Sequence, residues 1–201
     1  MGSSIKNVLC LTIITLVAGF GLGYVYEITK EPIAQMEEST KLAAYRSVFP
    51  AASDFTEVEN VSDTATGVLS SAGISGVDID SAVRALDASQ NPIGYIINTT
   101  SHEGYGGDIS ISLGVDNDGK VTGMEILKIT ETAGLGMKAK DARFKDQFRD
   151  KTVTQFSYTK TGATSDFEID AISGATITTK AVTNAVNAAL ACFRSLGGDM
   201  Q

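Results

Sequence analysis

The residues with the clearest chemical potential lie between Asp170 and Thr176, where the chain reads Asp-Ala-Ile-Ser-Gly-Ala-Thr. This small-residue loop leads into a segment with helical spacing. The unpaired backbone N–H groups of a helix N-terminus, together with the helix dipole, form a site for a phosphate. The dipole contributes only ~0.3–1 kcal/mol at an exposed helix end, too little to retain a ligand that lacks a deep pocket. A covalent phosphoester to the Thr176 hydroxyl would retain it. Gly174 and Ala175 leave that hydroxyl accessible, and Asp170 supplies a carboxylate beside the loop.

The same stretch also has a simpler interpretation as a helix cap. Ser and Thr are common N-cap residues because their hydroxyls accept a hydrogen bond from an unpaired backbone N–H. Ser173 or Thr176 would then only begin the C-terminal helix. Spacing alone favours this interpretation over a phosphate site.

The sequence contains few residues suited to metal binding or to side-chain catalysis. His102 is the single histidine, which argues against a His-based metal site or a catalytic triad, and we expect it to be a surface or structural residue. Cys10 and Cys192 form no Cys-x-x-Cys pair, which argues against an iron–sulfur or zinc framework. We assign no catalytic residue and no metal site, so any redox chemistry must come from an organic cofactor.

Two motifs carry a resemblance to a known family. The stretch that ends at Thr176 resembles the motif on which flavin transferases attach flavin mononucleotide (FMN) through a phosphoester to the final threonine. Residues 131–136, Glu-Thr-Ala-Gly-Leu-Gly, resemble the Glu-Thr-Pro-Gly-Leu-Gly loop of the FMN-binding domain in two related respiratory proteins. These are the G subunit of the Rnf electron-transport complex and the C subunit of the sodium-translocating NADH:quinone reductase. Residues 104–107 and 143–148 also resemble that domain, and residues 26–33 resemble the Rnf protein in particular.

The resemblance implies a set of cofactor-binding residues around a covalent FMN on Thr176. Leu135 would pack on the isoalloxazine, loop N–H groups would bond its polar edge, and Tyr105 would lie on or near the ring. Ala133 stands where the family usually has Pro, which would leave the loop less rigid. The complete implied set is Thr176, Asp170, Ser173, Gly174, Ala175, Glu131, Thr132, Gly134, Leu135, Gly136 and Tyr105.

A second Gly-Ala-Thr occurs at residues 162–164. Tyr158 stands six residues before Thr164, where Asp170 stands six residues before Thr176. We therefore expect Thr176, and not Thr164, to be the attachment site.

An uncharged N-terminal stretch should anchor the protein in a lipid bilayer. The run from Val8 to Tyr26 contains no charged residue and as a helix would extend roughly 28 Å, close to the ~30 Å hydrocarbon core of a membrane. A cleaved signal peptide is the alternative, although the run is longer than a usual signal core. Pro32 is expected to end the anchor or to begin a separate amphipathic helix over residues 33–49. We place the anchor in residues 1–27 and one FMN-binding domain in residues 28–201.

The remaining pattern predicts an α+β domain with an antiparallel sheet flanked by helices. Residues 81–88 and 93–99 read as one hairpin, and residues 108–115 and 121–129 as another, with Asn117-Asp118-Gly119 at its turn. A Gly-rich loop, a short helix at residues 142–148 and a final helix at residues 178–196 follow. Residues 51–79 read as loops with a short strand.

The net charge limits the kinds of partner, and the charges on either side of the anchor indicate its orientation in the membrane. The formal net charge of −8 argues against nucleic acid as a partner. Lys6 and the terminal amine precede the anchor, whereas Glu27, Lys30 and Glu31 follow it. This bias favours a short cytoplasmic N-terminus and a body on the outer face of the membrane.

These features together predict an electron carrier and not a stand-alone catalyst. By resemblance, the protein would relay electrons through FMN in a membrane complex that couples ferredoxin:NAD oxidoreduction to sodium or proton transport. Its partners would be the other proteins of that complex and a flavin transferase during maturation. Two alternatives are the C subunit of the quinone reductase, with the same flavin chemistry, and a membrane-tethered binding module without a cofactor.

Overall fold

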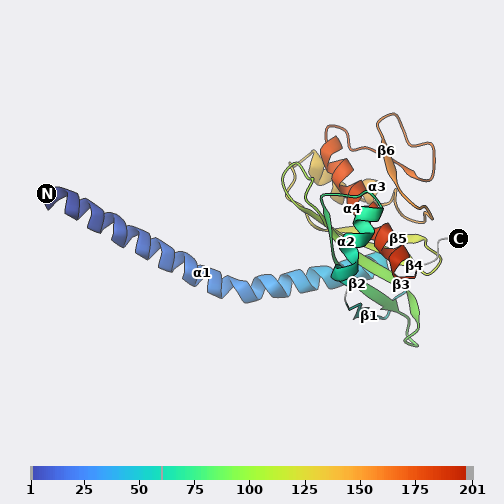
Figure 1. Ribbon diagram of the computed structural model, residues 1–201, viewed down its shortest axis with the longest axis horizontal. Helices are drawn as coiled ribbons and strands as arrows, with labels where there is room; N and C mark the ends of the chain where they lie inside the picture. Colours follow the sequence, from blue (N-terminus) through green and yellow to red (C-terminus); the bar gives the residue numbers. More distant parts are fainter. Residues whose placement is uncertain (1, 60, 198–201) are drawn as a thin grey trace. The chain divides into compact units, whose positions relative to one another are not determined.

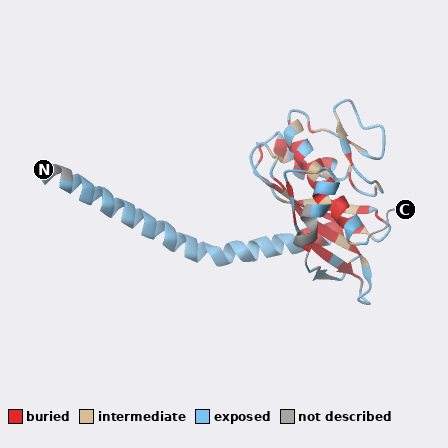
Figure 2. Ribbon diagram, viewed as in Figure 1, coloured by how far each residue is buried: buried red, intermediate tan, exposed pale blue. Residues whose placement is uncertain are grey.

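The computed structural model describes residues 2–59 and 61–197, which fall into two compact units divided between Leu42 and Ala43. The first unit is the long exposed part of helix α1 (Gly2–Val48). Among the described residues, α1 is the one helix that is long enough and apolar enough to cross a membrane. Figure 2 shows residues 5–42 of this helix as exposed.

Pro32 does not end the helix, contrary to the expectation from sequence. It lies inside α1, which continues to Val48. Proline removes one backbone hydrogen bond and crowds the preceding turn, which disfavours a helix interior. The flanking residues in α1 are exposed on all sides, so no packed neighbour prevents the helix from adjusting around the ring.

The second unit is built on a five-stranded antiparallel sheet in the order β1-β2-β3-β4-β5 (Figure 1). Both hairpins expected from the sequence are present, and Pro92 begins a strand, where its missing N–H interrupts no ladder. The strands are β1 (Asp54–Glu57), β2 (Val77–Leu86), β3 (Pro92–Ser101), β4 (Ile109–Asp116) and β5 (Val121–Lys128).

Short elements and one long helix complete the unit. The interpretation of residues 51–79 as loops with a short strand missed a helix there, and a small parallel strand pair was also missed. Ser, Thr and Asp, which favour turns, fill the missed helix, so its composition hid it. The elements are α2 (Val61–Ser71), η1 (Gly136–Lys140), α3 (Ala142–Lys145), β6 (Ser157–Thr159), β7 (Glu168–Asp170) and α4 (Thr176–Ser195).

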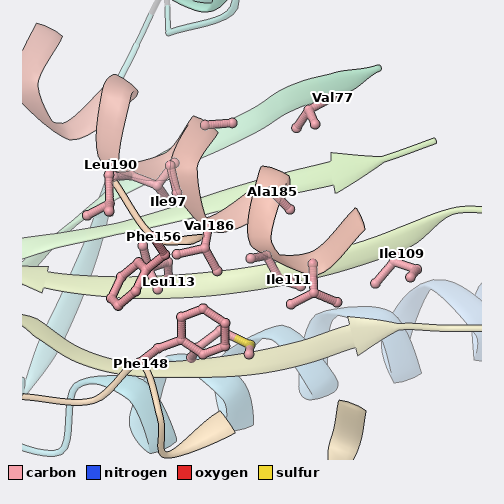
Figure 3. Packing of buried hydrophobic residues seen from close by; sticks show 14 of the residues in the cluster. Val77, Ile97, Ile109, Ile111, Leu113, Phe148, Phe156, Ala185, Val186 and Leu190 are labelled. Carbon is pink, nitrogen blue, oxygen red and sulfur yellow. The ribbon is translucent and has the colours of Figure 1, made fainter. Parts of the chain in front are cut away.

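The main core lies between α4 and one face of the sheet. Ile109, Ile111, Leu113 and Val115 alternate along β4 and are fully buried. Figure 3 shows Ile109, Ile111 and Leu113 beneath the small and apolar face of α4, and Phe148 and Phe156 belong to the same cluster. The two phenylalanine rings meet edge to face with centroids 5.0 Å apart.

The last turn of α1 belongs to the second unit and packs there in a small cluster of its own. Val48 and Phe49 are buried in it, and the Thr122 hydroxyl donates to the Val48 carbonyl at 2.5 Å. The buried Asn98 amide donates to the Tyr45 hydroxyl at 2.6 Å. These contacts fix residues 44–49 to the sheet.

Candidate functional site

A tight turn carries the small residues before Thr176. The Ala175 N–H donates to the Ile172 carbonyl at 2.9 Å, which closes a four-residue turn. Gly174 has φ +76°, a backbone conformation that glycine adopts without steric cost at this turn position. The Thr179 hydroxyl accepts from the Ile172 N–H and donates to the Ala175 carbonyl, each at 3.0 Å, and so binds the turn to the first turn of α4.

Thr176 is the first residue of α4, and its hydroxyl is free. The N-cap position is Ala175, without a side-chain capping bond, so the interpretation of Ser173 or Thr176 as the cap is wrong. Thr176 is half-buried, and within residues 2–59 and 61–197 its hydroxyl makes no hydrogen bond. An unpartnered hydroxyl beside the unpaired N–H groups of a helix start is available for substitution by a phosphate.

Glu131 organises the second loop of the site. This side chain is 8% exposed, and its Oε1 accepts the backbone N–H groups of Tyr105 at 2.7 Å and Gly106 at 3.2 Å. A Cβ on Gly136 would lie 2.6 Å from Glu131 Oε2 and also 2.6 Å from Thr178 Oγ1. Glycine at position 136 is therefore required by close packing between this loop and the start of α4.

The two loops expected to bind the cofactor meet around one cavity of about 620 Å³. We name residues 172–175, before the expected attachment site, the attachment turn, and residues 131–136 the glycine loop. A Cβ on Gly174 would lie 3.2 Å from Leu135 Cδ2, so the two are in contact. The cavity brings eight of the eleven expected residues together. Its lining residues are Tyr105, Glu131, Thr132, Leu135, Gly136, Gly174, Ala175, Thr176, Ile177 and Thr178.

Three expected residues do not line this cavity. Asp170 and Ser173 line a neighbouring cavity of about 580 Å³, on the other side of the turn, together with Lys138 and Arg143. The Asp170 carboxylate accepts the Ala163 N–H at 2.6 Å, so it supports a different loop. Gly134, with φ +75°, shapes the glycine loop from outside the lining.

Two lining residues were not anticipated from the sequence, Ile177 and Thr178. Both follow Thr176 directly, and a ligand at a helix start also meets the second and third residues of the helix. The signal available was an isolated Ile between threonines, outside the apolar face of the helix. Thr178 is buried beneath the loop at 1% exposure, while Ile177 projects at 52%.

Neither His102 nor Cys192 lines either of these two cavities. The His102 ring nitrogens bond Asp108 at 2.9 Å and Asp78 at 3.0 Å. These two carboxylates raise the pKa of His102 to about 8. Burial raises the pKa of the Cys192 thiol to about 11, which keeps it protonated and unreactive. The described residues contain no group of three or more His, Cys, Asp or Glu side chains placed to hold a metal ion.

Comparison with known proteins identifies the family. Residues 104–191, which include both loops of the cavity, match the FMN-binding domain family. The chain is 32% identical over 190 residues to the G subunit of the Na(+)-translocating ferredoxin:NAD(+) oxidoreductase complex of Acetobacterium woodii, covering 94% of this chain and 90% of that protein. This chain belongs to the G-subunit family of ion-translocating oxidoreductase complexes. The corresponding protein of the proton-translocating ferredoxin:NAD(+) oxidoreductase complex of Clostridium ljungdahlii is 31% identical, covering 90% of this chain and 86% of that protein.

Solved structures show that the fold extends to a second family. The C subunit of the Na(+)-translocating NADH-quinone reductase of Parabacteroides distasonis aligns with a TM-score of 0.51 at 20% identity, covering 75% of this chain and 80% of that one. The resemblance to both families predicted from sequence is thus present, with the sequence relatives among the G subunits.

Proposed function

We propose that this member of the G-subunit family carries FMN on Thr176 through a phosphoester and relays electrons within an ion-translocating membrane complex. The observation that supports it best is the unpartnered Thr176 hydroxyl in the wall of the cavity, as judged over the described residues. The loop from Glu131 to Gly136 supplies another part of the wall, and both parts belong to the stretch that matches FMN-binding domains.

The residues present fit the cofactor in size and chemistry. A volume of about 620 Å³ lies within the ~300–1,000 Å³ range of small-molecule sites. Leu135 and Ile177 supply apolar walls for a flat ring, and Thr176, Ile177 and Thr178 are at the helix start, where N–H groups lack intrahelical acceptors. These N–H groups would hold the phosphate next to the hydroxyl that carries it.

The chain's own contribution is to hold and tune the cofactor. FMN, when bound, accepts and donates electrons one at a time. Glu131 orders the backbone at Tyr105 and Gly106, and it places a carboxylate in the cavity wall. A fixed negative charge there would oppose added negative charge on the flavin and so lower its reduction potential.

The partners follow from the named functions of the relatives. We propose that the protein works with the other proteins of a complex that passes electrons between ferredoxin and NAD. One relative's complex is named for sodium and the other's for protons, at 32% and 31% identity. The run from Val8 to Tyr26 contains no ionisable carboxylate, so we assign ion coupling to other parts of the complex.

The proposed location is a single pass through the lipid bilayer, with residues 28–201 on the outer face. The exposed apolar helix α1 and the basic residue Lys6, which precedes its uncharged run from Val8 to Tyr26, support this orientation. A flavin transferase on the same side would then reach Thr176 during maturation.

The proposal is tested by expressing the full chain with and without a flavin transferase and by recording in-gel flavin fluorescence under denaturing conditions. We expect a fluorescent band only when the transferase is present. A dark band, with transferase activity verified on a known substrate protein, would contradict the proposal and support a cofactor-free tethered module.

A further inference from the structure

Exposed apolar side chains of the second unit gather at the mouth of the proposed flavin cavity. Among the described residues after Leu42, the large apolar side chains classed as exposed are Tyr105, Leu135, Phe167 and Ile177. Three of the four line the cavity. Exposed apolar groups that cluster in this way mark ligand or protein interaction sites, whereas scattered ones do not.

The three cavity-lining side chains differ in how far they are exposed. Tyr105 is 73% exposed and Ile177 is 52% exposed, so both project from the wall toward solvent. Leu135 is less exposed, at 43%, and contacts the attachment turn. We name Tyr105, Leu135 and Ile177 the apolar rim.

Basic residues flank the apolar rim on one side. Residues 138–151 contain six basic and three acidic side chains, a formal charge of +3 in a chain of −8. Lys138 follows the cavity-lining Gly136 by two residues, and it lines the neighbouring cavity with Arg143. The basic segment therefore lies directly beside the proposed flavin site.

Three of these basic side chains form no ion pair among the described residues. Lys138, Lys140 and Arg143 are exposed and make no ion pair within the described part of the chain. By contrast, Lys120, Lys145, Arg149, Lys151 and Lys180 each pair with a carboxylate. Asp141 and Asp170 also line the neighbouring cavity, and Asp170 is bonded to the Ala163 N–H. We name Lys138, Lys140 and Arg143 the basic rim.

We propose that the apolar rim and the basic rim together form the docking surface for a redox partner protein whose contact face has an apolar centre and an acidic edge. An apolar centre with charged residues around it is the usual arrangement of a protein interface, with Tyr among its enriched residues. Opposite charges at the edge steer the partner and fix its orientation. This inference rests on the proposed function, because docking here would bring the partner's carrier next to the flavin.

A protein partner suits the surface better than a lipid surface. Anionic lipid headgroups would repel a domain of net negative charge, and three cations offset little of it. An acidic protein surface could instead meet the basic rim alone and leave the acidic remainder of the domain in solvent.

The test uses the complete complex in membranes, with the rate of partner-driven flavin reduction measured at low and high salt. Charge reversal by Lys138→Glu with Arg143→Glu should slow this rate about ten-fold at low salt, and the difference should shrink at high salt because salt screens exposed charges. Arg46→Glu with Lys160→Glu changes two exposed cations that likewise make no ion pair within the described part of the chain, so it is the matched charge control and should leave the rate near wild type.

A second pair tests the apolar rim. Tyr105→Ala should lower the partner-driven rate per bound flavin about five-fold at both salt concentrations, a larger loss than the same variant shows with a small chemical reductant. Phe167→Ala removes the exposed apolar side chain outside the cavity and should change neither rate.

The outcomes separate the two proposals. A wild-type protein without covalent flavin overturns the proposed function itself. Equal rates in all flavin-loaded variants overturn the docking surface alone. Charge reversal that slows the rate when the complex is in vesicles containing phosphatidylglycerol, but not when it is in neutral phosphatidylcholine vesicles, also overturns it, in favour of a lipid-binding surface.

Discussion

The chain contains Gly-Ala-Thr twice, and the two copies differ in what surrounds the threonine. Thr164 lies in an exposed loop between β6 and β7, and both its hydroxyl and its N–H donate to the Glu168 carboxylate at 3.0 Å. Thr176 begins a 20-residue helix and lines a cavity, with a hydroxyl free of hydrogen bonds among the described residues. The same three residues therefore yield one structural hydroxyl and one that is available for chemistry.

Asp170 links the two copies. In the sequence it belongs to the motif of Thr176, yet its carboxylate bonds the Ala163 N–H in the other copy. Its backbone is clamped by Gln147, whose Oε1 accepts the Asp170 N–H at 2.6 Å. The spacing of a motif thus records neighbours in the chain, whereas the hydrogen bonds show which loop each side chain supports.

The largest difference is expected between two single variants, in which either Thr176 or Thr164 is replaced by alanine. Thr176→Ala should abolish covalent flavin, because it removes the hydroxyl that would carry the phosphoester, while the fold remains intact. Thr164→Ala should leave full flavin content. Fluorescence of the denatured bands measures both, and flavin retained on Thr176→Ala would break the comparison.

The two glycines provide a second, smaller contrast. Gly174→Ala places a Cβ at φ +76°, 3.2 Å from Leu135, so it should cost roughly 1–2 kcal/mol of stability and reduce flavin attachment. Gly162 has φ +100° but no atom within 4 Å of a Cβ there. Gly162→Ala should therefore strain its own loop and leave attachment unchanged. Thermal unfolding and fluorescence separate these effects, and equal attachment in both variants would contradict the role of the turn.

Two carboxylates can be compared in the same way: Glu131 lines the cavity with Thr176, and Glu168 accepts hydrogen bonds from Thr164. Glu131→Gln removes a negative charge from the cavity wall and should raise the flavin midpoint potential on the order of tens of millivolts. Hydrogen bonds from the Thr164 N–H and hydroxyl keep the pKa of Glu168 below its ordinary value, so that carboxylate is also charged. Glu168→Gln should nevertheless leave the potential unchanged. Redox titration of the two variants is the measurement, and equal shifts would refute the assigned location of the flavin.

The smallest effect is expected on folding stability and concerns His102, which directly follows β3 and precedes Tyr105 by three residues. Its pKa is raised from 6.5 to about 8 in the folded state by Asp108 and Asp78. The stabilisation is therefore complete below pH 6.5 and is lost as the pH rises through 8. Chemical denaturation across this range should show the loss in wild type and not in His102→Ala. Identical pH profiles would contradict the ion-pair role.

Much of the sheet could be predicted because its patterns are local. The alternation from Ile109 to Val115 and the turn at residues 117–119 specify a hairpin without reference to the rest of the chain. The first helix was predicted with a break at Pro32, because a proline rule has no information on whether neighbours are packed.

The candidate site was predictable only where it followed a known motif. Residues of the glycine loop and the attachment turn lie around one cavity, as the family resemblance implied. Ile177 and Thr178 were missed because their role depends on how the loop packs against the helix start. The position of Asp170 depends on a hydrogen bond from Ala163, in the loop between β6 and β7. Such long-range contacts leave no periodic signal in the sequence.

The most direct test of the central claim is peptide mass mapping of the full chain after co-expression with a flavin transferase. We expect the peptide containing Thr176 to gain the mass of FMN less one water, and the peptide containing Thr164 to keep its unmodified mass. FMN found on Thr164, or on neither peptide when the transferase is active, would show that Thr176 is not the attachment site.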